Sequence, residues 1–151
     1  MMLNLDAIMT TELVTIAPSA TLAEARSMMQ ERRIRHLPVV DDRGDFVGLL
    51  TQTDMLAATD SFLRDEKSRL QAEEIRVEDV MVTKIATVEP GASLRSAALF
   101  LEQHRIGCLP VVAGAKLVGI VTDTDFVGVA INLLEQLEEA EPLESGFDSE
   151  E

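Results

Sequence analysis

The 151-residue chain carries the same pattern twice, and this internal repeat constrains its fold more than any other feature. Residues 8–40 align with residues 80–112 without a gap, and both stretches contain Leu-Pro-Val-Val. One residue drops out in the turn that follows, and residues 47–54 then align with residues 118–125. A match of this length with one small gap indicates duplication of a structural unit. We therefore expect two halves of similar structure.

The first part of each unit is expected to be a short strand followed by a helix. Residues 13–16 contain Val, Thr and Ile, which favour strands, and Ala-Pro follows them. Thr21 to Glu24 has the form of a capping box, in which two side chains cap each other's backbone amide. Apolar residues at helical spacing follow, and the helix should end near Arg32 or Arg33.

A hairpin is expected next, because two apolar runs flank a turn rich in Asp and Gly. The runs are residues 36–40 and 46–50, and the turn contains Gly44, for which we predict a positive φ. The second half has a shorter turn, residues 113–116, at the same place. Each half then reads as strand, helix, strand, strand, helix, and the predicted class is α+β.

The last helix of each half carries a long apolar stripe. In the first half this helix should run from Gln52 into the seventies, with Leu56, Leu63 and Leu70 at heptad spacing. The equivalent stripe in the second half consists of Phe126, Ala130, Leu133, Leu134 and Leu137. Two such stripes at matching positions predict a homodimer. Packing of each helix on its own sheet alone is the alternative.

The repeat also divides the chain. We assign residues 1–72 to the first repeat and residues 73–137 to the second, including its short leading segment. Residues 138–151 form an acidic tail without Lys or Arg, which we expect to be disordered.

Charge and composition restrict the partners. The formal net charge of −14 argues against nucleic acid and anionic lipid, which both need a basic surface. A single cysteine, Cys108, cannot form an intrachain disulfide, and no apolar run approaches the ~18 residues of a membrane span. Residues 1–9 lack the features of a secretory signal. We expect a cytoplasmic protein with no membrane insertion.

The repeated motifs resemble those of a known family. Each copy has a Val-Met-Thr-like start (residues 8–10 and 80–82), the Leu-Pro-Val-Val strand, and Gly, two apolar residues and then Thr-x-x-Asp. In this order, over about residues 4–137, they resemble the CBS domain, the regulatory repeat of the cystathionine-β-synthase type, and a tandem pair resembles a Bateman module. The resemblance implies a pseudo-two-fold pair of repeats. In many members the clefts between them hold AMP, ADP, ATP or S-adenosylmethionine.

The resemblance also assigns roles to residues at equivalent positions. Asp54 and Asp125 would bind ribose, and Thr51 and Thr122 would bind phosphate. The other expected lining residues are Thr15 and Thr87 on the first strands and, around the adenine, His36, Leu37, Pro38, Cys108, Leu109 and Pro110.

A Thr and an Asp at the start of a helix also have a purely structural explanation. The unpaired backbone N–H groups there attract anions, a carboxylate suits two ribose hydroxyls, and a Thr hydroxyl can donate to phosphate. The same spacing can instead form a capping box, with the Thr capping one amide and the acid reaching back. Both interpretations stay open, and they are compatible with each other.

Charges distinguish the two copies. Asp123 adds an acid to the second site, which disfavours a polyphosphate there. We therefore predict that the first cleft binds phosphate better, and that AMP or S-adenosylmethionine fits more easily than ATP without Mg²⁺. The basic residues near the motifs that could compensate are Arg33, Arg35, Arg105 and Lys116.

The sequence shows no catalytic or metal-binding pattern. The two histidines and one cysteine form no cluster of zinc spacing, and no Ser-His-Asp or Cys-His arrangement is visible. His36 is expected to be a polar cleft residue and His104 a solvated helix end. The predicted function is a regulatory sensor of an adenosine ligand, with no required cofactor, acting on an unknown effector protein. The alternatives are a ligand-free dimeric interaction module and the subunit of an enzyme whose catalytic chain is separate.

Overall fold

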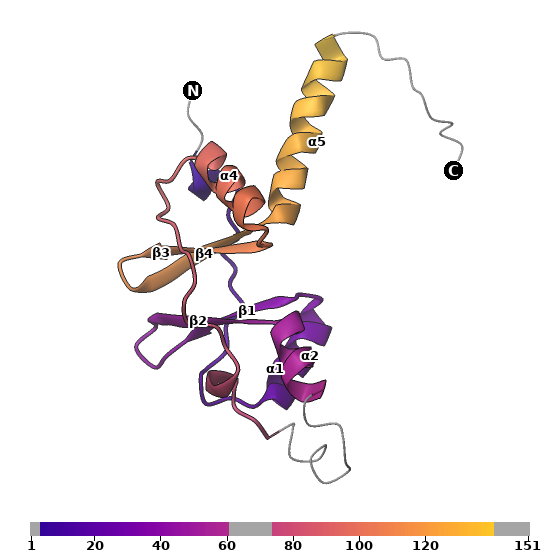
Figure 1. The fold of residues 1–151 in the computed structure, drawn as a ribbon. Coiled ribbons are helices and arrows are strands. Elements are labelled where there is room, and N and C mark those ends of the chain that lie inside the picture. Colours follow the sequence, from indigo (N-terminus) through magenta and orange to yellow (C-terminus); the bar gives the residue numbers. More distant parts are fainter. Residues whose placement is uncertain (1–3, 61–73, 141–151) are drawn as a thin grey trace, which may run out of the picture.

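The two halves of the chain contain the same elements in the same order (Figure 1). The computed structural model describes residues 4–60 and 74–140. The first half consists of η1 (Leu5–Ala7), α1 (Leu22–Arg32), β1 (His36–Val40), β2 (Phe46–Thr51) and α2 (Gln52–Asp60). The second half consists of η2 (Val77–Asp79), α4 (Leu94–His104), β3 (Cys108–Ala113), β4 (Lys116–Thr122) and α5 (Asp123–Ala140). The predicted α+β class and repeated arrangement are confirmed.

Each half is built on one antiparallel hairpin, as predicted. His36 lies opposite Thr51 in the pair β1–β2, and Cys108 lies opposite Thr122 in the pair β3–β4. Gly44, in the first turn, has a φ of 85°, which confirms the predicted positive value. Glycine adopts this left-handed conformation without the steric cost that a β-carbon adds. The two hairpins face each other at the centre of the molecule, with the helices outside (Figure 1).

The first strand expected in each half is present only as a single bridge. Ile16 pairs in parallel with Val39, and Val88 pairs in the same way with Val111. The rest of residues 13–16 is extended chain outside any strand. Each hairpin therefore gains one short parallel contact along β1 or β3.

The first helix of each half is capped at both ends by local sequence. The capping box predicted for α1 is confirmed, because the amides of Thr21 and Glu24 each donate to the other's side chain at 3.2 Å. The helix ends at Arg32, as expected. Arg33 and Arg105, which follow α1 and α4, have φ values of 55° and 52°. Glycine is the usual residue in this left-handed position.

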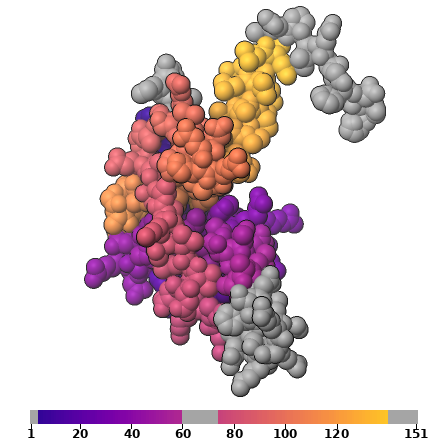
Figure 2. Space-filling view, in the orientation of Figure 1, coloured from indigo at the N-terminus to yellow at the C-terminus, as the bar shows by residue number. Residues whose placement is uncertain are grey.

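The expected end of the last helix can be compared with the structure only in the second half. α2 is described as far as Asp60, so Leu63 and Leu70 of the expected stripe lie outside the described residues. α5 continues to Ala140, so residues 138–140, assigned to the tail, are helical. The remainder of the expected tail, residues 141–151, is also outside the described part. α5 extends well away from the body of the molecule (Figures 1 and 2).

The halves exchange their leading segments. Leu5 is fully buried in the core of the second half, whereas Val77 is fully buried in the core of the first. Thr10 pairs with Ile120 of β4, and the equivalent bridge joins the segment after η2 to β2. In Figure 1, η1 accordingly lies beside α4 and η2 lies below β2. The chain after η2 then runs along the front of both halves (Figure 2).

Candidate ligand clefts

Two equivalent clefts lie between the halves, and we name each after its threonine. The Thr51 cleft has a volume of about 480 Å³ and the Thr122 cleft about 290 Å³. The Thr51 cleft is lined by His36, Leu49, Thr51, Val82, Lys84, Ile85, Ala86, Phe100, His104, Ile106, Gly107 and Cys108. The Thr122 cleft is lined by Thr10, Glu12, Leu13, Val14, Arg33, Ile34, Arg35, His36, Pro38, Ile120, Thr122, Asp123 and Thr124.

Each cleft combines the threonine of one half with the leading segment and first hairpin strand of the other. Arg33 and Arg35 therefore line the Thr122 cleft together with Asp123. Neither arginine lines the Thr51 cleft, although Arg35 also lines a small cavity together with Thr51. The physical reason is the pseudo-two-fold packing of the hairpins, which places β1 opposite the end of β4 across the interface.

A smaller cavity of about 170 Å³, here called the central cavity, shares lining residues with both clefts. It lies between the starts of α2 and α5, and its lining includes residues of both clefts. These residues are Arg35, His36, Thr51, Gln52, Thr53, Gly107 and Asp123.

The helix starts are held by matching hydrogen bonds to the segments before β1 and β3. The amide of Gln52 donates to the carbonyl of Arg35 at 2.9 Å, and the amide of Asp123 donates to the carbonyl of Gly107 at 3.2 Å. Each half thus ties its own last helix to the chain that leaves its first helix. These bonds hold the backbone directly after Thr51 and Thr122, which line the two clefts.

Each Thr-x-x-Asp motif forms one half of a capping box, and the two halves differ. In the first motif, the amide of Asp54 donates to Thr51 Oγ1 at 3.0 Å. In the second, the amide of Thr122 donates to Asp125 Oδ2 at 2.8 Å. The Asp54 carboxylate has no hydrogen-bond or ion-pair partner among residues 4–60 and 74–140, whereas one Asp125 oxygen is already engaged. Capping therefore uses the acid in the second copy but leaves it free in the first.

Several residues expected in the clefts lie elsewhere. Thr15 and Thr87 are exposed and line neither cleft, whereas Val14 and Ala86, one position earlier, do. Side chains alternate along extended chain, so an error of one residue reverses the face. Among the expected adenine neighbours, Pro38 and Cys108 are cleft residues, but Leu37 and Leu109 are fully buried core residues and Pro110 is also fully buried.

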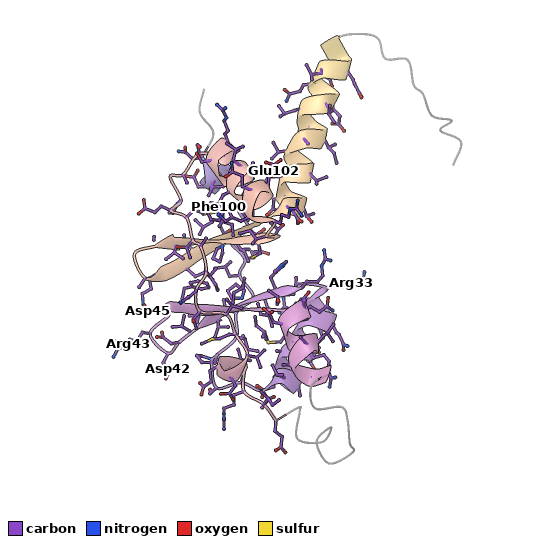
Figure 3. All side chains as sticks on the ribbon, viewed as in Figure 1. Arg33, Asp42, Arg43, Asp45, Phe100 and Glu102 are labelled. Atoms are coloured by element: carbon purple, nitrogen blue, oxygen red, sulfur yellow. The ribbon has the colours of Figure 1, made fainter. Side chains whose placement is uncertain are left out.

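Lys116 is far from both clefts. Its ammonium group forms an ion pair with Asp45 at 2.7 Å and donates to the carbonyl of Arg43. Asp45 and Arg43 lie at the side of the molecule opposite Arg33 (Figure 3). The role expected of Lys116 as a compensating charge is therefore wrong, and this residue instead joins the tips of the two hairpins.

The structure adds cleft residues that sequence reasoning missed. Lys84 and His104 line the Thr51 cleft, and the His104 ring stacks on Phe100 with centroids 4.0 Å apart. Glu12, which lines the other cleft, is the equivalent of Lys84 in the repeat. A reversal of charge between two aligned copies was the signal in the sequence that could have identified this pair.

Two titratable groups in the clefts have shifted pKa values. Burial lowers the pKa of His36 and the nearby Arg35 lowers it further, against an opposing effect of Asp123. Burial raises the pKa of the Cys108 thiol to about 12, with smaller contributions from Asp123 and Asp125. His36 is therefore mostly neutral, and Cys108 is an uncharged thiol, at neutral pH. Over the described ranges, no cluster of three or more His, Cys, Asp or Glu residues could hold a metal ion.

The comparisons with known proteins agree with this architecture. The CBS domain family model matches residues 5–61 and 77–132. The CBS domain-containing protein YhcV of Bacillus subtilis is 35% identical over 113 residues, which is 75% of either chain. A protein from Vibrio cholerae, described as an acetoin utilization protein (AcuB), is 43% identical with a TM-score of 0.80, covering 94% of this chain and 100% of its own. CBSX2, solved in complex with AMP, is 29% identical with a TM-score of 0.74, covering 87% and 98%.

The chain therefore belongs to the CBS domain family, and its two repeats form a CBS domain pair. No helix within the described residues is long and apolar enough to cross a membrane.

Proposed function

We propose that the chain is a regulatory module that binds an adenosine phosphate of the AMP type in the Thr51 cleft. The composition of that cleft is the observation that carries the proposal. Its volume of about 480 Å³ lies within the roughly 300–1,000 Å³ of small-molecule sites, which are mainly apolar with a few placed polar groups. The structure of the related CBSX2 with AMP supports this ligand class.

The cleft offers a distinct group for each part of the ligand. Adenine fits the apolar part formed by the segment after η2 and the start of β3. Asp54 is not part of the cleft lining but lies three residues after Thr51, in the first turn of α2. Its free carboxylate suits the two ribose hydroxyls of a ligand that extends past Thr51, because a carboxylate accepts two hydrogen bonds. The hydroxyl of Thr51 and the ammonium of Lys84 suit the phosphate, since a charged donor gives the stronger hydrogen bonds.

The Thr122 cleft is the weaker site in this proposal. Glu12 and Asp123 oppose Arg33 and Arg35 in its lining, and its volume of about 290 Å³ is smaller. The lining of the Thr51 cleft, by contrast, contains no carboxylate. Phosphate should therefore prefer the Thr51 cleft. The reason is the presence of Lys84 and the absence of Asp and Glu from its lining, and not the arginines.

Titration calorimetry with AMP tests the proposal. Asp54→Ala should weaken the tighter binding event at least tenfold, since a hydrogen bond to a charged group is worth about 1.5–3 kcal/mol. Asp125→Ala should affect only the weaker event. Asp42→Ala, in the exposed turn of the first hairpin (Figure 3), is the matched control and should change neither. Equal losses in Asp54→Ala and Asp125→Ala, or no binding of AMP, would contradict the proposal. Competition by S-adenosylmethionine, ADP and ATP then ranks the natural ligand.

The proposed role is regulatory: ligand binding changes how the chain acts on an effector protein. We propose that this effector is an enzyme on a different polypeptide chain. Purification of the chain from its own cells, with mass spectrometry of any retained ligand and copurified protein, identifies both partners.

A second candidate function is assembly, and one observation favours it. Five apolar residues of α5 are between 52% and 66% exposed, namely Val127, Ile131, Leu133, Leu134 and Leu137. An exposed apolar stripe of this kind marks an association surface. We propose a homodimer whose interface covers this face of α5. A substitution that disrupts this surface should abolish dimerisation and leave ligand binding unchanged.

A further inference from the structure

His36 lies where three cavities meet. It lines the Thr51 cleft, the Thr122 cleft and the central cavity. No other residue in the described ranges 4–60 and 74–140 lines all three. One imidazole is therefore accessible from both candidate ligand sites.

A difference between the two repeats gives His36 this position. His36 and Cys108 are equivalent, but Cys108 lines only the Thr51 cleft. The residue before Cys108 is Gly107, where the first repeat has Arg35. A β-carbon at Gly107 would lie 3.8 Å from His36 Nε2 and 3.5 Å from Asp123 Oδ2. A longer side chain at residue 107 would fill the space beside the imidazole, and the glycine leaves that space open.

The charged groups that share these cavities with His36 are mostly basic. Burial and Arg35 both disfavour the imidazolium, so the free imidazole is mostly neutral at about pH 7.5 and can take up a proton when an anion approaches. The basic neighbours are Arg33 and Arg35 after α1, Lys84 after η2 and His104 at the end of α4, and the acidic ones are Glu12 in the leading segment and Asp123 at the start of α5.

Building on the proposed function, we propose that His36 is a phosphate-recognising residue shared by the two clefts, so that a nucleotide bound in either cleft causes the same imidazole to take up a proton from solvent. A phosphate within reach favours the imidazolium and accepts a charge-assisted hydrogen bond from it. Because one proton serves both sites, the sites are linked, and the linkage is reciprocal. A second nucleotide meets an imidazole that is already charged.

Two variants that each weaken one cleft make the test specific. In Asp125→Ala the Thr51 cleft is intact, and in Asp54→Ala the Thr122 cleft is intact. Adding His36→Gln should lower the affinity for AMP at least tenfold in both variants, as expected for the loss of a charge-assisted hydrogen bond. In the Asp125→Ala variant, whose Thr51 cleft is intact, it should not change the affinity for adenosine. Cys108→Ser, at the equivalent position, should change AMP binding only in the Thr51 cleft.

A second measurement needs no substitution of His36. The chain has two histidines, so the Cε1 proton of His36 is readily assigned by NMR, and its pKa should rise on addition of AMP in both single-cleft variants. An effect of His36→Gln on one cleft alone, or a pKa rise in one variant alone, overturns this inference and leaves the proposed function intact. Failure of the unsubstituted chain to bind AMP overturns both.

Discussion

The backbone of Gly119 lies directly against the side chain of Met9: a β-carbon at residue 119 would be 2.6 Å from the Met9 sulfur. Gly48 and Met81 show the same relationship at the same distance. The methionine of each leading segment thus packs on the glycine in the hairpin of the other half. This contact explains why each copy of the repeated motif contains both a Met and a Gly.

We predict that Gly119→Ala lowers the free energy of unfolding by about 1–3 kcal/mol, the usual effect of overpacking. Urea denaturation measures the change. Gly128→Ala is the control, because Gly128 lies within α5 with nothing near its missing β-carbon, and alanine should stabilise the helix by up to about 1 kcal/mol. Adding Met9→Ala to Gly119→Ala should recover part of the loss. Strict additivity of the two substitutions would contradict the contact.

Arg33→Gly should raise stability and weaken ligand binding at the same time. The φ of 55° at Arg33 costs a residue with a β-carbon about 1 kcal/mol, which glycine avoids. The lost guanidinium should reduce AMP affinity in the Thr122 cleft, which calorimetry on the Asp54→Ala background detects. Arg32→Gly, inside the last turn of α1, should instead destabilise by about 1 kcal/mol. Stabilisation by both substitutions would show that backbone strain is not the cause.

The Cys108 thiol should make the chain less stable at high pH. Its pKa is about 12 in the folded chain against an ordinary value of 9.0, so above pH 9 the unfolded chain binds fewer protons than the folded one. The free energy of unfolding should therefore fall as pH rises from about 9 toward 12, by about 1.4 kcal/mol at pH 10. Urea denaturation of the wild type and Cys108→Ser at pH 8 and pH 10 measures the difference. Parallel losses in the two proteins would rule the thiol out.

Leu134→Glu should dissociate the proposed homodimer. Leu134 is 55% exposed in the described chain, and a carboxylate buried at an apolar interface is strongly unfavourable. Sedimentation velocity should show a smaller species for Leu134→Glu than for the control Gln136→Glu, which adds the same charge on another side of α5. AMP binding should survive in both variants. Identical sedimentation of the two variants would exclude this face of α5 from the interface.

The sequence was sufficient for the local structure. Thr21 and Glu24 identified the start of α1, Gly44 the turn of the first hairpin, and the repeat itself the family. Each of these features depends on residues close together in the chain, whose geometry follows from capping, turn chemistry and side-chain periodicity. The assignment of residues to the clefts was less successful. Thr15 was expected to line a cleft, but the neighbouring Val14 does so instead. All four residues from 13 to 16 favour a strand, so the sequence does not show which side chains face the cleft.

The pairing of the clefts could not be predicted from the repeat. Alignment shows that Thr51 and Thr122 are equivalent, but it does not say which half supplies the opposite wall. The packing of the hairpins decides this, and it brings Arg33 to Thr122 and Lys84 to Thr51. Long-range packing of this kind leaves no periodic trace in the sequence.

The exchange of the leading segments has a consequence for how the chain came to be duplicated. A single repeat with this sequence pattern would lack Leu5 or Val77 in its own core, and two copies would have to swap segments to complete both cores. Domain swapping is a low-cost route to dimers. The duplicated chain is then a swapped dimer made permanent by a covalent connection, which keeps the effective concentration of each half high for the other. Unfolding of one half should remove Leu5 or Val77 from the core of the other half. Both halves should therefore unfold in one cooperative transition.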